Sequence, residues 1–73
     1  MLDKLTQIIR NHTGNKDLVV SEDSVLILDL GLNSLDLVNL ACLVEDEFDI
    51  EIPDRKIKEL KTVGDVIAFI ENQ

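Results

Sequence analysis

The chain has 73 residues, of which 45% are hydrophobic, and its formal net charge is −8 at pH 7. This length suits a single domain, residues 1–73, whose one cysteine and one histidine exclude an internal disulfide and a zinc site with three or four ligands. A small domain without these supports must be stabilised by its apolar core, here mostly Leu, Ile and Val.

The acidic residues are concentrated in the middle of the chain. Residues 17–54 contain eleven acids and no Lys or Arg, and four basic residues follow between positions 55 and 61. Such a surface repels nucleic acids and anionic membranes and attracts basic protein partners. The sequence also contains no apolar run of signal-peptide or membrane-spanning length, so we expect a soluble, cytoplasmic monomer.

The first expected helix covers residues 2–12. Its apolar residues recur at the spacing of one helix face, and they are Leu2, Leu5, Ile8 and Ile9. Gly14 suits a left-handed helix end, and His12 lies where a cation complements the helix dipole. We therefore expect His12 to be a helix-end residue without a chemical role.

A long connection, residues 15–33, follows this helix. Compact domains rarely contain so long a segment without regular structure, so we expect its leucines and isoleucines to pack on the core. Residues 24–28 are expected to form a short turn, which Ser21 and Ser24 are suited to cap.

The second helix is expected to begin at Asn33 or Ser34 and to end near Phe48. Asn33 is a favoured N-cap residue, and Asp36, three positions later, completes a pair similar to a capping box. A short third helix is expected over residues 54–60, after Pro53.

The final helix is expected to start after the cap residue Thr62, with Asp65 three positions later. Its inward residues are predicted to be Val63, Val66, Ile67 and Ile70. The prediction is an all-α fold of three main helices, one short helix and one long loop.

The second helix has two apolar faces when residues 34–48 are placed on a helical wheel at about 100° per residue. The first is an ordinary core stripe of Leu37, Leu40, Ala41, Val44 and Phe48. The second lies roughly opposite and contains Leu35, Val38 and Cys42, among Asn39, Glu45 and Asp46. An apolar patch with an acidic rim is typical of a docking surface, unless the long connection covers Leu35, Val38 or both.

Ser34 has three possible roles at the start of this helix. It could cap the helix, act as a nucleophile, or be modified by another enzyme. A nucleophile needs a base within reach, but the only histidine belongs to another helix and the chain lacks a G-x-S-x-G elbow. A helix start favours an attached phosphate, because its free N–H groups and dipole attract negative charge.

The segments "DLGLNSLDLVNLACLVEDEFDIEIPD" and "LKTVGDVIAFIE" resemble acyl carrier proteins of the type II, phosphopantetheine-carrying kind, and the similarity extends over essentially the whole chain. The resemblance implies a four-helix bundle that is not an enzyme and has no metal site. It implies that a phosphopantetheinyl transferase attaches 4′-phosphopantetheine from coenzyme A to Ser34, using magnesium. An acyl chain is then carried as a thioester to fatty-acid or polyketide-type enzymes.

In such proteins the helix that starts at the serine recognises the partner enzymes. The residues that would meet their basic patches are Asn33, Leu35, Asp36, Val38, Asn39, Cys42, Glu45 and Asp46. Asn33 replaces the usual Asp of the family's D-S-L motif, which removes one charge beside the modification site. A peptidyl or aminoacyl carrier, or an unmodified protein-binding adaptor, remains an alternative, and the pathway and acyl group stay open.

Overall fold

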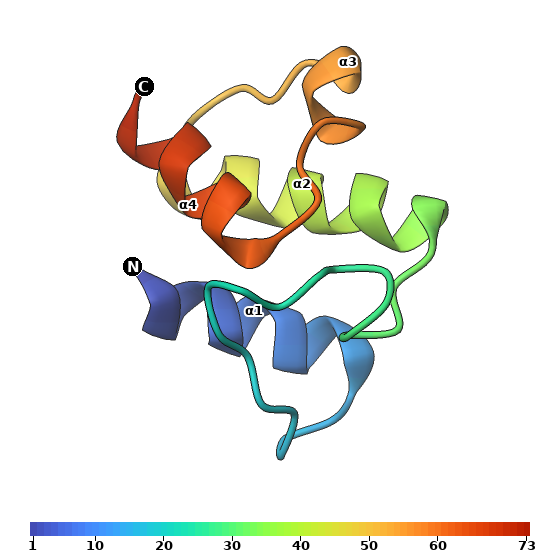
Figure 1. Cartoon of the computed structure of the whole chain (residues 1–73). Helices are drawn as coiled ribbons and strands as arrows, with labels where there is room; N and C mark the ends of the chain where they lie inside the picture. Colours follow the sequence, from blue (N-terminus) through green and yellow to red (C-terminus); the bar gives the residue numbers. More distant parts are fainter.

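The computed structural model describes residues 1–73 and contains four helices, shown in Figure 1. Helix α1 covers Leu2–Thr13, α2 covers Ser34–Phe48, α3 covers Asp54–Ile57 and α4 covers Val63–Glu71. Helices α1 and α2 pack against each other and run in opposite directions, and α2 also contacts α3. None of the helices has the length and apolar character needed to cross a membrane. The predicted all-α, four-helix fold is confirmed.

One cluster of thirteen buried hydrophobic residues forms the core. Its members are Leu5, Ile9, Leu26, Leu30, Leu32, Leu40, Ala41, Val44, Ile52, Val63, Val66, Ile67 and Ile70. The inward residues predicted for α4 are all buried. Leu37 and Phe48 of α2, together with Leu2 and Ile8 of α1, are partly buried and pack against the cluster. The inner faces predicted from helical spacing are therefore confirmed.

Helices α2 and α4 both begin with a reciprocal capping box. Asn33 Oδ1 accepts a hydrogen bond from Asp36 N at 2.8 Å, and Asp36 Oδ2 accepts one from Asn33 N at 3.0 Å. In the same way, Thr62 Oγ1 accepts a hydrogen bond from Asp65 N, and Asp65 Oδ2 accepts one from Thr62 N, both at 3.1 Å. These bonds satisfy N–H groups that a helix start leaves without partners. Helix α1 ends, as predicted, at a left-handed Gly14 with φ +73°.

The connection between α1 and α2 is anchored to the start of α4. Leu26 N donates to Lys61 O at 2.9 Å, and Val63 N donates to Ser24 O at 3.0 Å. The buried Ser24 hydroxyl accepts a bond from Ser21 N at 3.0 Å, which confirms the paired serines at the predicted turn. These bonds hold the middle of the connection against the segment that leads into α4.

The expectation that all leucines and isoleucines of this connection pack on the core is wrong for Ile27 and Leu28. Ile27 is 51% exposed and Leu28 is 82% exposed. Asp29 N and Leu30 N both donate to Val25 O, so this stretch turns like a helix. Leu26 and Leu30, four positions apart, then share the inner side, and the two residues after Leu26 face outward.

Helix α3 is shorter than predicted, because it ends at Ile57 rather than at residue 60. Beyond it the chain continues in turns of mixed geometry: Glu59 N donates to Lys56 O, three positions earlier, and Leu60 N is shared between Ile57 O and Lys56 O, three and four positions earlier. Bonds from a residue to the one three positions earlier are typical of 3₁₀ geometry, which often closes a short helix. Pro53 takes the N-cap position, with Asp54 as the first helical residue.

Leu5→Ala should lower the free energy of unfolding by about 2–5 kcal/mol, because it removes a core side chain and leaves a cavity. Leu5 is 1% exposed, whereas Leu28, the matched control, is 82% exposed. Leu28→Ala should change the same quantity by less than about 0.5 kcal/mol. Urea denaturation of both variants measures the difference, and equal losses would contradict the assigned core.

The two capping boxes also predict how stability depends on pH. The N–H of Asn33, and next the bond with His12, lower the pKa of Asp36 from its ordinary value of 3.8. The N–H groups of Thr62 and Lys61 lower the pKa of Asp65 in the same way. A carboxyl whose pKa is lower in the folded chain stabilises it fully above the unfolded value and loses that effect as pH falls through the folded value.

The urea midpoint should therefore fall as pH is lowered from about 5 to about 2, and Asp36→Asn and Asp65→Asn should each make that fall shallower. Asp17→Asn, which changes an exposed carboxylate outside any helix start, serves as the control. An acid-induced fall with the same slope in the wild type and in the double variant Asp36→Asn/Asp65→Asn would refute this assignment.

Candidate functional site

Ser34 is the first residue of α2 and is exposed. The cap of this helix is Asn33, whose side chain accepts the bond from Asp36 N. The hydroxyl of Ser34 makes no hydrogen bond within the chain, so the interpretation of Ser34 as the helix cap is wrong. The sequence thus assigns capping to one residue and leaves a free hydroxyl on the next.

The backbone around Ser34 favours a negative charge. The N–H groups of Ser34 and Leu35 have no acceptor within the chain, because the capping box uses those of Asn33 and Asp36. Free N–H groups at the start of a fifteen-residue helix, together with its dipole, stabilise a nearby anion. A phosphate attached to the Ser34 hydroxyl therefore fits this position both sterically and electrostatically.

His12 reaches the same helix turn from α1. Its Nε2 lies 3.0 Å from Asp36 Oδ1, and both side chains are partly buried. This contact joins the end of α1 to the first turn of α2, so the expectation that His12 is only a helix-end residue is incomplete. The two residues lie 24 positions apart in sequence, and nothing in the pattern near either residue indicates the pair.

An open cleft of about 520 Å³ lies beside Ser34. It is formed by the long connection, α2 and α3, and its lining residues are Ile27, Ser34, Leu37, Val38, Asp54, Ile57 and Lys58. Most of the lining is apolar, with one acid and one base from the α3 region. The cleft gives a flexible group on Ser34 a surface to lie against. Sequence reasoning missed it, because it depends on how three segments meet.

The second apolar face of α2 is exposed. Leu35 is 68% exposed and Val38 is 45% exposed, so the alternative in which the long connection covers them is wrong. Cys42, a free cysteine, is exposed on the same face together with Asn39 and Asp46. Leu43, at the flank of the face, is 42% exposed. A patch of this kind, apolar with a polar rim, suits a protein partner.

Two acids predicted for this face are engaged within the chain. The carboxylate of Asp36 bonds Asn33 and His12, as described above. Glu45 is half-buried, and its Oε2 accepts a bond from Ile52 N at 2.8 Å. Glu45 thus fixes the segment after α2 and is not a free side chain of the face.

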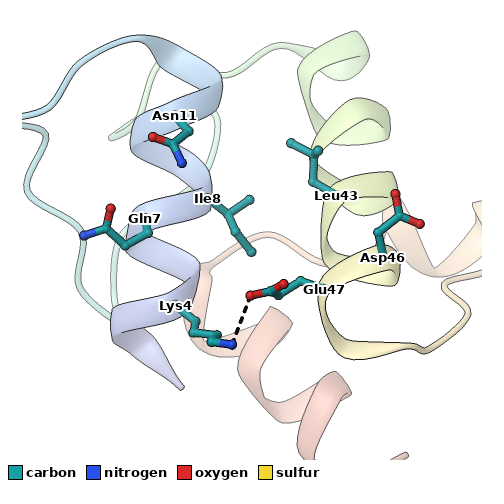
Figure 2. Close-up of a pocket in the computed structure, with 7 residues that line it drawn as sticks. All are labelled: Lys4, Gln7, Ile8, Asn11, Leu43, Asp46 and Glu47. Carbon is teal, nitrogen blue, oxygen red and sulfur yellow. Dashed lines mark ion pairs between the residues drawn. The ribbon is translucent and has the colours of Figure 1, made fainter.

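A groove of about 530 Å³ lies between α1 and α2, and Figure 2 shows its lining. Ile8 from α1 and Leu43 from α2 form its apolar part. An ion pair between Lys4 Nζ and Glu47 Oε1, at 3.0 Å, spans the two helices. Asp46 lines this groove and also lies beside the exposed face of α2. The groove therefore borders the exposed apolar face of α2.

The titratable groups near Ser34 do not form a catalytic arrangement. No hydrogen bond links Ser34 to His12, whose Nε2 is 3.0 Å from Asp36 Oδ1. No three His, Cys, Asp or Glu side chains come together as a metal site. What the geometry offers is an accessible hydroxyl, an anion-favouring helix start, a cleft and an exposed apolar face.

Comparisons with known proteins agree with this description. The profile of the family described as "Phosphopantetheine attachment site" matches residues 3–70. The chain is 42% identical over 72 residues to an acyl carrier protein of Sulfurovum sp. (strain NBC37-1), covering 99% of this chain and 96% of that protein. It is 41% identical over 70 residues to an acyl carrier protein of Clostridium perfringens (strain SM101 / Type A), covering 96% and 92%.

A solved structure of a candidate acyl carrier protein from Mycobacterium tuberculosis has the same fold. The TM-score is 0.88 at 36% identity, over 96% of this chain and 93% of that chain. The chain therefore belongs to the acyl carrier protein family, whose members bear phosphopantetheine and act as carriers, not as enzymes.

Proposed function

We propose that Ser34 bears the 4′-phosphopantetheine group and that the chain delivers thioester-bound acyl intermediates to successive biosynthetic enzymes. The observation that carries this proposal is the capping arrangement, in which Asn33 caps α2 and leaves the exposed Ser34 hydroxyl free. The unpaired N–H groups of Ser34 and Leu35 favour the phosphate, and the adjacent cleft offers the arm a surface.

The attachment reaction needs a partner enzyme to supply its base. Ser34 Oγ would form the new bond to phosphorus, the nucleotide part of coenzyme A would leave, and the hydroxyl proton would pass to the transferase. His12 is not placed for this task, because its Nε2 lies beside Asp36. When bound, the group supplies a terminal thiol that holds the acyl chain. Tethering then presents the cargo to each enzyme at a high effective concentration.

The exposed face of α2 is the proposed recognition surface, with Leu35, Val38 and Cys42 at its centre. Asn39 and Asp46 supply a polar and acidic rim, and the net charge of −8 would attract basic partner surfaces. Asp36 and Glu45 contribute charge, although their carboxylates bond within the chain. Contacts of this kind form fast and release readily, which suits a carrier that visits several enzymes.

The acidic recognition helix and the "EIPD" segment favour an acyl cargo of a fatty-acid or polyketide-type pathway over an aminoacyl or peptidyl cargo. Asn33 caps the helix as well as the family's usual Asp, so this substitution leaves the fold intact and changes only the charge beside Ser34. The monomeric state and the cytoplasmic location expected from the sequence stay predictions.

Incubation of the wild type with coenzyme A, magnesium and a broad-specificity phosphopantetheinyl transferase should add the mass of one phosphopantetheine group. Ser34→Ala should show no mass gain, because it removes the acceptor hydroxyl. Ser24→Ala is the matched control, since Ser24 is 9% exposed and bonded to Ser21, and it should still be modified. A wild type that gains no mass while a known carrier is modified would favour the adaptor alternative.

Leu35→Ala and Val38→Ala should each weaken binding to the transferase by about tenfold, as expected for apolar residues at the centre of an interface. Val19→Ala, which changes an 80% exposed residue of the long connection, should leave the affinity unchanged. Titration of the apo protein by isothermal calorimetry or fluorescence measures these affinities. Equal binding by all three variants would show that partners recognise a different surface.

A further inference from the structure

The cleft beside Ser34 contains a single cationic side chain, that of Lys58. Lys58 is the C-cap residue of α3, while Ser34 opens α2 and Ile27 belongs to the long connection. The fold therefore brings a lysine from the basic segment to the one serine that stands free at a helix start. The apolar walls between them are formed by Leu37, Val38 and Ile57.

Lys58 has no acidic partner in the chain. The ion pairs present are Lys4–Glu47, His12–Asp36 and Lys56–Glu59, and none of them includes Lys58. Asp54 lines the same cleft one helical turn earlier, but its carboxylate lies beyond ion-pair distance of the Lys58 ammonium. The exposed ammonium of Lys58 is thus available to an anion that enters the cleft.

We propose that Lys58 binds the phosphodiester that joins the arm to Ser34 and so holds the first part of the arm in the cleft. The inference rests on the proposed modification of Ser34. A phosphate on this hydroxyl stays at the edge of the cleft, because one of its oxygens is Oγ of Ser34, which lines the cleft. The helix N–H groups would contact it from one side and Lys58 from the other, and lysine is a common phosphate ligand.

This role makes Lys58 a positioning residue for the arm. With the phosphodiester held, the apolar part of the arm beyond it lies against Val38, Ile57 and Ile27. Without Lys58, the only charged side chain left on the cleft would be Asp54, which repels the phosphate. An exposed ion pair is modest in strength, so its loss should lower the ratio of docked to free arm by about two- to fivefold.

The test compares the holo forms of the wild type, Lys58→Gln and Arg55→Gln. Arg55 is the matched control because it is an exposed cation of α3 that does not line the cleft. Conversion from apo to holo in the wild type should shift the backbone signals of Ile27 and Ile57 in ¹H–¹⁵N spectra. In Lys58→Gln these shifts should shrink, by up to about fivefold because they scale with the docked fraction, and the ³¹P signal should move toward that of the free diester. Arg55→Gln should match the wild type.

A second measurement on the unaltered holo protein keeps the inference testable if Lys58→Gln resists modification. Raising NaCl from about 0.05 M to about 0.5 M should screen the ion pair and move the same signals toward their apo positions. Holo Lys58→Gln with wild-type signals, or wild-type signals that ignore salt, would overturn the role of Lys58. A wild type that gains no mass would instead refute the proposed modification, so the two failures are distinguishable.

Discussion

The capping box at the start of α2 is the interaction on which the site depends. Asn33 and Asp36 satisfy two N–H groups of the first turn, and this leaves the intervening Ser34 hydroxyl and two further N–H groups without internal partners. If Ser34 itself were the cap, its oxygen would accept an internal hydrogen bond and sit closer to the helix end. Separating the cap from Ser34 keeps this serine both accessible and fixed in position at the helix start.

His12 adds a tertiary tether to this local arrangement. The carboxylate of Asp36 uses Oδ2 for the capping box and Oδ1 for His12 Nε2. Helix α1 therefore holds the same turn that Asn33 caps. The domain is small and lacks disulfides, so each such tether is a sizeable part of its marginal stability. The tether also lies on the α1 side of the helix, while the cleft and Lys58 lie on the α3 side. The tether and the cleft thus lie on different sides of one turn.

Local patterns predicted most of the fold, because its helices obey them. The spacing of Val63, Val66, Ile67 and Ile70, the two caps and the left-handed Gly14 each depend on residues within a few positions. The exposed face of α2 was predictable for the same reason, since a helical wheel needs only the helix itself. The identity of Ser34 as the candidate site came from the family resemblance, because a serine at a helix start is more often a cap.

Contacts between distant segments could not be predicted in this way. The pairing of His12 with Asp36, the bond from Ile52 N to Glu45 and the cleft shared by Ser34 and Lys58 all depend on packing across the chain. The outward position of Leu28 was missed because the turn from Val25 to Leu30 follows a helical rather than an extended period. The shorter α3 follows from the mixed bonds over three and four positions after Ile57, which sequence patterns do not distinguish from a continued helix.

The charge pattern has a different meaning once the fold is known. In the sequence, the acids of residues 17–54 and the bases of residues 55–61 look like two separate blocks. The fold brings one base of the second block, Lys58, back to the serine inside the first. A basic partner that approaches the acidic side of α2 would be attracted by the body of the carrier but repelled by Lys58, while an anionic group on Ser34 would be attracted by Lys58. In the proposed arrangement, Lys58 would favour the arm in its cleft in the free carrier, and a partner's own cations would weaken that preference by competing for the phosphate.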